Sequence, residues 1–216
     1  MSRNSAGGSG PDSPRFDLTH HFLIAMPGVQ DSGFAGSIIY LCEHSEDGAL
    51  GLVINKPSDI DLKTLFERVD LPLGRADLAD LPVFAGGPVN TERGFVLHEA
   101  MTPDALPDGS PHAAEKNEPV YASTLSIPGG LEMTTSKDVL EALSHGKGPR
   151  KLLVSLGYSA WARNQLESEL AANFWLTVHA DPAVIFDTPV SQRYERALLL
   201  LGLQEAWALS PEAGHA

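Results

Sequence analysis

The stretch SIIYLCEHSEDGALGLVI, residues 37–54, predicts a β-hairpin. Two apolar runs rich in β-branched residues, 37–43 and 49–54, flank a polar segment that ends in Asp47-Gly48, a dipeptide typical of tight turns. Upstream, the apolar run 22–26 is ended by Pro27-Gly28 and predicts a buried strand. We therefore expect a β-sheet at the centre of the fold.

The same patterning predicts strands interleaved with helices along the rest of the chain. Thr135 and Asp138 are expected to form a capping box for one helix, and Ser159 to cap the next. No Gly/Ser-rich linker divides these segments, so we expect one α+β domain, a mixed and twisted β-sheet packed with about four helices. Further apolar runs predict strands at 82–85, 94–98, 119–125, 130–133, 151–156, 174–178 and 183–186. Apolar residues at helical spacing predict helices at 61–69, 136–145 and 160–172, and a last helix from Thr188-Pro189 to Gly202.

The folded domain is expected to span residues 15–216. Three segments, two inside this range and one before it, lack the apolar patterning. Residues 1–14 are small, polar and poor in apolar side chains, so we expect them to be disordered. The segment 101–118 carries three prolines and no periodicity, which predicts a long loop, either functional or mobile. Residues 204–216 are expected to form a C-terminal tail.

The charge balance excludes one class of partner. Acidic residues number 28 and basic residues 15, which gives a formal net charge of −13. Such a surface repels phosphate backbones, so direct nucleic-acid binding is not expected. No apolar stretch approaches the ~20 residues that a membrane helix needs, and the N-terminal segment lacks the apolar core of a secretory signal, so we expect a cytoplasmic protein. A single cysteine excludes an intramolecular disulfide, and no metal or cofactor is expected.

Motif-like segments are spread over nearly the whole chain beyond residue 20. They are LIAMPGVQDSGFAGSIIYLCEHSEDGALGLVINKP (23–57), FAGGPV (84–89), RGFVLH (93–98), LLVSLGYSAW with NQLESEL (152–170) and NFWL (173–176). Together, and in this order, they resemble the AlgH/YqgE family of bacterial proteins. Two positions differ from the family pattern: the usual Gly-Trp pair is Ala160-Trp161, and Asn164 replaces a glycine that usually precedes the glutamine.

This resemblance implies a single α+β domain whose mixed sheet curls toward a pseudo-barrel packed with helices. It assigns no biochemical activity, although some members of the family are labelled transcriptional regulators. It therefore implies a regulatory or binding protein. Any effect on transcription is expected to be indirect, because the charge of −13 disfavours contact with DNA.

Cys42 is the first candidate site residue. Strand alternation places Tyr40, Cys42 and His44 on one face, where an imidazole could approach the thiol and, if protonated, favour the thiolate. A reactive or redox-sensing thiol is one interpretation. The other is a small, buried and inert cysteine.

His44 and His98 are candidate neighbours of that thiol. If the strands that carry them are adjacent, one Cys and two His offer three ligands, enough in principle for a metal. The spacing does not require a metal, and two histidines with structural hydrogen bonds are the alternative.

Two loops are candidate sites for a small anion. Asn55-Lys56-Pro57 and Gly86-Gly87-Pro88 each follow a predicted strand, and glycines let a backbone approach a ligand closely. Lys56 and Arg93 could supply positive charge. Plain turn chemistry is the alternative.

Gly157–Trp161 resembles a nucleophile elbow, but Trp161 stands where that motif needs a second glycine. We therefore expect Ser159 to cap a helix rather than to act as a nucleophile. Trp161, Trp175 and Trp207 are expected to serve packing rather than base stacking.

The sequence thus favours a non-enzymatic protein that binds an unidentified protein or small ligand, with Cys42 as the residue for any redox sensing. One alternative is a cysteine-dependent enzyme that uses Cys42 with His44 or His98 as base. Another is a small-anion or nucleotide-binding protein built on the Asn55 and Gly86 loops. No catalytic residue is assigned.

Overall fold

A computed structural model describes residues 17–29, 33–101 and 119–202. The predictions for residues 1–14, 102–118 and 204–216 lie outside these ranges. The strands are β1 (His21–Ala25), β2 (Ile38–Ser45), β3 (Gly48–Val53), β4 (Pro57–Asp61), β5 (Pro82–Ala85), β6 (Val89–Glu99), β7 (Thr124–Ile127), β8 (Leu131–Thr134), β9 (Leu152–Ala162) and β10 (Trp175–His179). The α-helices are α1 (Leu62–Arg68), α2 (Asp138–Ser144), α3 (Gln165–Ala171), α4 (Pro182–Phe186) and α5 (Arg193–Leu200), and short 3-10 turns lie at Ala76–Leu78 and Val190–Gln192.

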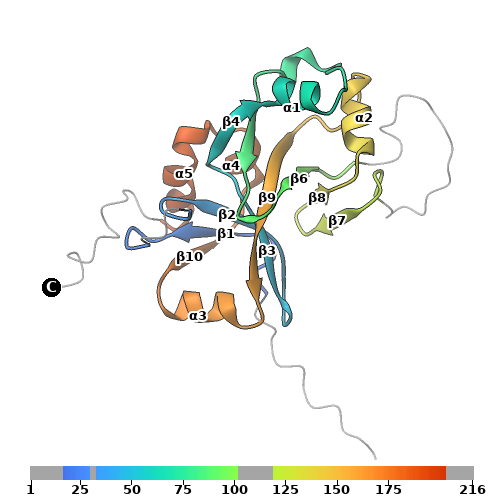
Figure 1. The fold of residues 1–216 in the computed structure, drawn as a ribbon. Helices are drawn as coiled ribbons and strands as arrows, with labels where there is room; N and C mark the ends of the chain where they lie inside the picture. The colour runs from blue at the N-terminus through green and yellow to red at the C-terminus, as the bar shows by residue number, and fades with distance from the viewer. Residues whose placement is uncertain (1–16, 30–32, 102–118, 203–216) are drawn as a thin grey trace, which may run out of the picture.

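The strands form one mixed sheet that curls into a half-barrel (Figure 1). The order along the main path is β10-β1-β2-β3-β9-β6-β8-β7, and β4 pairs with β5 beside it. The β5–β9 pair is parallel, whereas the other described pairs are antiparallel. The expected α+β domain with a curled sheet is confirmed.

Strand β9 is the centre of the sheet. Its first half lies between β5 and β6, and its second half pairs with β3. The change of neighbours occurs at Gly157, where φ is +71°. At this point β9 crosses the Gly86-Gly87 loop so closely that a Cβ on Gly87 would lie 2.3 Å from the carbonyl carbon of Tyr158. Glycine is therefore required where the two halves of the sheet meet.

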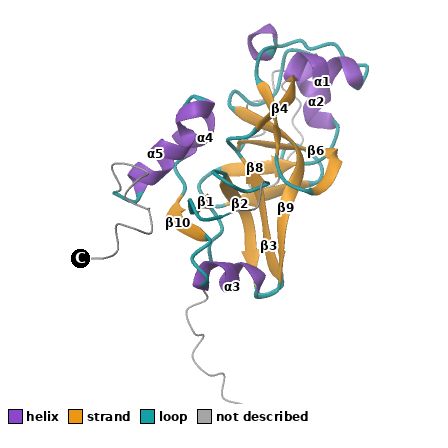
Figure 2. Ribbon diagram, turned by 60° about the vertical axis from the view of Figure 1, so that its left-hand side comes forward, coloured by secondary structure: helices purple, strands orange, loops and turns teal. Residues whose placement is uncertain are grey.

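The helices close three apolar clusters, and Figure 2 shows where the helices lie around the sheet. Helices α4 and α5 cover the inside of the half-barrel, where Val184 and Ala197 pack on the cluster that contains Tyr40. Helices α1 and α2 cover a second cluster, at the end of the molecule away from α3. Helix α3 buries Leu166 against the outer side of β2 and β9. Helix α1 follows from its sequence, because Leu62, Leu65 and Phe66 are buried and Asp61 caps the N-terminus by accepting a hydrogen bond from Thr64 N at 2.8 Å.

Most predicted elements are confirmed, including the hairpin, and five α-helices are found in the described ranges instead of about four. The segment 183–186 is wrong as a strand: it forms α4, because Asp181 accepts from Ala183 N at 2.9 Å and Pro182 opens the helix. Strand β4 is not predicted, and the strand expected at 119–125 begins only at Thr124.

The predicted helix 160–172 is also too long. Strand β9 continues to Ala162, because Gly48–Gly51 of β3 pairs with it, and the helix begins only at Gln165. Ser159 therefore lies inside a strand, where its hydroxyl donates to Gly86 O at 3.2 Å, and it caps no helix. The capping box expected for α2 is wrong as well, since its N-cap is Lys137, without a side-chain capping bond. No helix in the described ranges is long and apolar enough to cross a membrane.

Candidate functional site

A β-bulge separates the two residues expected to form a thiol–imidazole pair. Leu41 pairs with Gly51 and Glu43 with Leu50, so Cys42 is the extra residue of strand β2. Beyond the bulge the alternation is reversed. Leu50, opposite Glu43, packs on the inner cluster that contains Cys42, whereas Ala49, opposite His44, belongs to the outer cluster under α3. Cys42 and His44 thus face opposite sides of the sheet, and the prediction of one shared face is wrong.

Cys42 lies in the hydrophobic core. It is 1% exposed, and its Sγ is 3.8 Å from Tyr40 O. Burial raises the pKa of the thiol well above its usual range, with a further contribution from the charge of Glu43. Tyr40 is also fully buried, and its hydroxyl is hydrogen-bonded to His20 Nδ1 at 2.9 Å. An inert, protonated cysteine fits this environment, and neither an oxidant nor a substrate has open access to it.

Both candidate histidines have structural roles. His44 accepts from Leu18 N at Nδ1 (3.0 Å) and donates from Nε2 to Glu167 Oε1 (2.9 Å), which ties the start of the described chain to α3. His98 is fully buried, donates from Nδ1 to Glu99 O (2.8 Å) and accepts from Thr134 Oγ1 at Nε2 (2.9 Å).

His98 also lies on a different face from the thiol. Its ring contacts Tyr121, a member of the cluster under α1 and α2. Burial lowers the pKa of His98. Within residues 17–29, 33–101 and 119–202, no three His, Cys, Asp or Glu side chains are grouped so that they could hold a metal. The three-ligand arrangement of Cys42, His44 and His98 is therefore not formed.

The two candidate anion loops are adjacent, and their polar groups bond within the protein. Asn55 accepts from Ile38 N and donates to Gly36 O, and Lys56 Nζ donates to Gly33 O at 2.7 Å. Pro57 opens β4, and Ala85 N donates to Lys56 O. The carbonyl of Gly86 accepts from Val53 N, while its N–H donates to Leu156 O. These contacts favour a structural role for both loops, as turns held at the crossing with β9, over an anion site.

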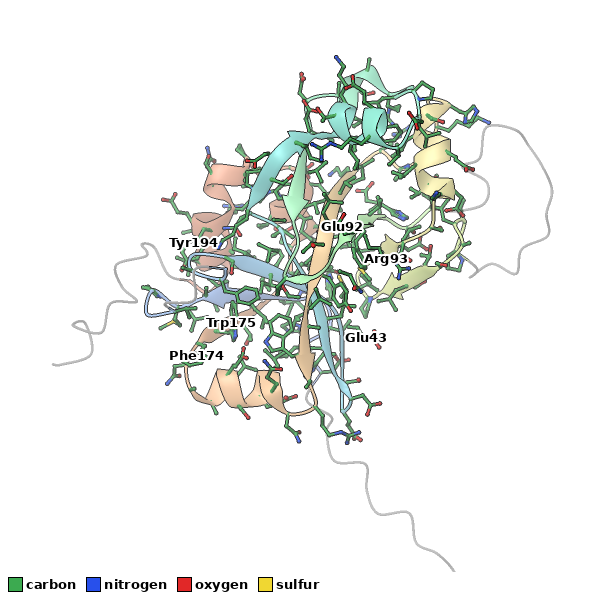
Figure 3. The ribbon with its side chains drawn as sticks, viewed as in Figure 1. Glu43, Glu92, Arg93, Phe174, Trp175 and Tyr194 are labelled. Atoms are coloured by element: carbon green, nitrogen blue, oxygen red, sulfur yellow. The ribbon has the colours of Figure 1, made fainter. Side chains whose placement is uncertain are left out.

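Arg93 does not join these loops. It extends from β6, where it donates to Thr135 Oγ1 at 3.0 Å and lies over the ring of Phe95. In Figure 3 Arg93 lies on the other side of β9 from Phe174 and Trp175.

An aromatic groove of about 600 Å³ lies between α3, the end of β9 and the start of β10. Trp161 and Trp175 form its walls at nearly right angles, with ring centroids 6.1 Å apart and an interplanar angle of 83°. Phe34 meets Trp175 in the same way, at 5.7 Å and 77°. Phe174 is 49% exposed at the rim. The groove is lined by Gly28, Val29, Phe34, Pro88, Ala160, Trp161, Gln165, Glu169, Phe174 and Trp175.

A single carboxylate holds the two walls in place. Oε2 of Glu169 accepts a hydrogen bond from Trp161 Nε1 and another from Trp175 Nε1, each at 2.8 Å. Its Oε1 accepts from Gln165 Nε2 at 2.9 Å. Both indole donors are thus used inside the protein. What the groove offers to a ligand is mainly apolar surface, which includes the half-exposed ring of Phe174, beside Glu169, the only charged side chain among the described lining residues.

The groove collects segments that are distant in sequence. Four of the five stretches that carry the family resemblance, 23–57, 84–89, 152–170 and 173–176, each contribute lining residues. Pro88 is the only candidate ligand residue from the sequence that lines it. Trp161 and Trp175 line it from the core cluster under α3, so the packing expected of these two residues is confirmed, and Trp207 lies outside the described residues. Glu169 is not identified from the sequence. The available signal is an acidic residue on a helix flanked by two strands that each carry a tryptophan.

The fold is a single α+β domain with a half-barrel sheet, and the groove is its candidate site. The chain belongs to the AlgH-like family, whose model matches residues 22–206. It is 71% identical to a UPF0301 protein of Variovorax paradoxus (strain S110) over 205 residues, 95% of this chain and 98% of the relative. It is 68% identical to a UPF0301 protein of Polaromonas sp. over 95% of this chain and 98% of that relative.

Solved structures agree with this assignment. The solution structure of the AlgH protein from Pseudomonas aeruginosa is 44% identical, with a TM-score of 0.68, and the match covers 98% of this chain and 100% of that one. A Corynebacterium diphtheriae crystal structure, 20% identical with a TM-score of 0.60 over 91% of this chain and 87% of that one, shares the fold. The family resemblance inferred from the sequence is confirmed.

Proposed function

We propose that this protein is a non-enzymatic binding protein whose aromatic groove receives a cationic side chain from a partner protein. The observation that carries the proposal is the carboxylate of Glu169, which the indole N–H groups of the buried Trp161 and Trp175 hold at the groove beside the half-exposed ring of Phe174. In this proposal the protein acts in the cytoplasm, and an effect on transcription arises through the partner.

The chemistry of the lining favours a cation. A guanidinium or ammonium group is attracted to the face of an aromatic ring by about 0.5–2 kcal/mol, depending on how far it is desolvated. Phe174 is the half-exposed ring of this lining, whereas Trp161 and Trp175 are each 5% exposed. Because the indole N–H groups of Trp161 and Trp175 donate to Glu169, the carboxylate charge lies in the plane of both rings. A formal net charge of −13 adds long-range attraction for a basic partner.

The surroundings of the groove favour a peptide segment as the carrier of that cation. Strand β10 begins at Trp175 and stands at the end of the sheet order, with β1 as its only described strand neighbour. An open strand edge beside a side-chain pocket is a recurring mode of peptide recognition. The exposed ring of Phe174 extends the apolar rim next to this edge.

The test compares two probes of similar length, N-acetyl-arginine amide and N-acetyl-norleucine amide. The indole N–H resonances of Trp161 and Trp175 should shift with the arginine probe at a dissociation constant on the order of 1 mM, and much less with the neutral probe. Phe174→Ala and Glu169→Gln should weaken binding of the arginine probe several-fold. Leu199→Ala removes a similarly exposed apolar side chain on α5 and should leave binding unchanged.

Equal binding of the norleucine probe would reduce the groove to an apolar contact surface and contradict cation recognition. An unchanged affinity in Glu169→Gln would remove the carboxylate from the proposal. A cysteine-dependent enzyme is not proposed, because Cys42 is sealed in the core and both histidines bond elsewhere.

A further inference from the structure

A second cavity, of about 280 Å³, lies between α1, β5, β9 and the segment from α4 to α5. Its lining is apolar except for Asp187, Thr188 and Arg193. The apolar walls include Leu62, Phe84 and Leu152. This cavity shares no lining residue with the aromatic groove.

The guanidinium of Arg193 is buried against this cavity and has no acidic partner among the residues that the structure describes. Arg193 is 7% exposed, and its described hydrogen bonds go to main-chain carbonyls: Nε donates to Thr188 O at 3.1 Å, and Nη1 donates to Ile54 O. Its Cζ lies 5.0 Å from the centre of the Phe84 ring. Across the described residues, no carboxylate forms an ion pair with it. Asp187, the acidic residue of the lining, pairs with Lys151 at 2.7 Å.

Burying a guanidinium without a counter-charge costs free energy unless an anion binds beside it. A buried charge loses its hydration, and neutral carbonyls do not replace the missing counter-charge. Burial lowers the pKa of Arg193 to about 10, with no acidic neighbour to offset it. Arg193 is also the first residue of α5, where the helix dipole disfavours a cation. Nη2 makes no described hydrogen bond, so this end of the planar guanidinium is available to an acceptor.

We infer that this cavity is a binding site for a small monocarboxylate with a short apolar tail, whose carboxylate pairs with Nη2 of Arg193. A guanidinium matches a carboxylate in shape as well as in charge. The tail lies among the side chains of α1, β5 and β9. The volume is at or below the lower end of ordinary ligand pockets, which restricts the ligand to a few carbon atoms.

Hexanoate is the probe, with hexanamide as its uncharged analogue and acetate as its short analogue. Titration calorimetry and thermal unfolding of the full chain should give a dissociation constant on the order of 1 mM for hexanoate. Hexanamide and acetate should bind at least tenfold more weakly. Inorganic phosphate should not compete, because it lacks the apolar tail.

Three variants separate this site from a general charge effect. Arg193→Met should abolish hexanoate binding, and Arg196→Met, which removes an exposed arginine of the same helix, should not. If Arg193→Met fails to fold, Val190→Trp keeps the guanidinium and fills the apolar part of the cavity, and it should abolish hexanoate binding on its own. Equal binding of hexanoate and hexanamide, loss of binding in Arg196→Met, displacement by phosphate, or no binding at 20 mM hexanoate would each overturn the inference.

Discussion

Gly86 and Ser155 approach each other so closely that a Cβ atom on Gly86 would lie 1.9 Å from Ser155 Oγ. The same Cβ would lie 2.4 Å from Gly157 O, so moving the serine side chain alone would not relieve the clash. This contact is where the loop after β5 crosses β9, and it determines how the two halves of the sheet meet.

Gly86→Ala should therefore destabilise the protein by about 3 kcal/mol, since its methyl group has no free volume and backbone atoms must move. Urea unfolding followed by tryptophan fluorescence measures the change. Gly94→Ala is the matched control, because a Cβ at Gly94 meets nothing within 4 Å. It should be neutral or stabilise the fold by up to about 1 kcal/mol, because alanine lowers the conformational entropy of the unfolded chain relative to glycine. Similar losses in both variants would contradict the crossing contact.

Short stretches of sequence predict the elements that depend only on their own apolar pattern and turn residues. The hairpin, α1 and the first half of β9 follow from apolar patterning and turn residues. Helix α4 is missed, because its apolar run Ala183–Phe186 matches a buried strand and only Asp181-Pro182 indicates a helix start. The continuation of β9 to Ala162 is missed because it depends on pairing with β3, more than a hundred residues earlier in the chain.

The candidate site is harder to predict, for a similar reason. Residues 38–42 are buried on both faces of the sheet, so their pattern is the same with or without a bulge at Cys42. Glu169 resembles any acidic residue on a helix until α3 places it between two indole rings. A carboxylate whose position depends on three elements leaves no local pattern.

Asn164 explains one departure from the family pattern. It replaces a usual glycine and has φ of +61° at the turn into α3, without a side-chain capping bond. Asparagine tolerates this left-handed conformation better than most residues do. Asn164→Gly should leave the free energy of unfolding within about 0.5 kcal/mol, whereas Asn164→Ala should lower it by about 1–2 kcal/mol. An alanine variant as stable as the glycine variant would show that this turn does not need a left-handed residue.

The buried His98 should make stability depend on pH. Burial lowers its pKa in the folded protein, despite the nearby carboxylate of Glu132, whose Oε2 lies 3.9 Å from Nδ1. As the pH falls through the ordinary histidine value of about 6.5, the unfolded chain takes up a proton that the folded chain excludes. The free energy of unfolding should therefore fall as the pH drops from 7 to 5.

Urea unfolding at pH 5, 6 and 7 measures this slope. His98→Gln, whose amide can still accept from Thr134, should reduce the slope. Part of the slope should remain, because burial also lowers the pKa of His20. Exposed His145→Gln is the control and should keep the full slope. A slope that is unchanged in His98→Gln would assign the pH dependence to other groups.

Cys42 should be unreactive in the folded protein. Its side chain is 1% exposed, and burial holds its pKa above that of a free thiol, so both access and thiolate are lacking. Iodoacetamide should modify the folded protein negligibly between pH 6 and 9. In denaturant the same thiol should react rapidly, with a midpoint at the free-cysteine value of about 8.5. Rapid alkylation of the folded chain with a midpoint well below that value would restore the redox-sensing hypothesis, and it would require the bulge of β2 to open in solution.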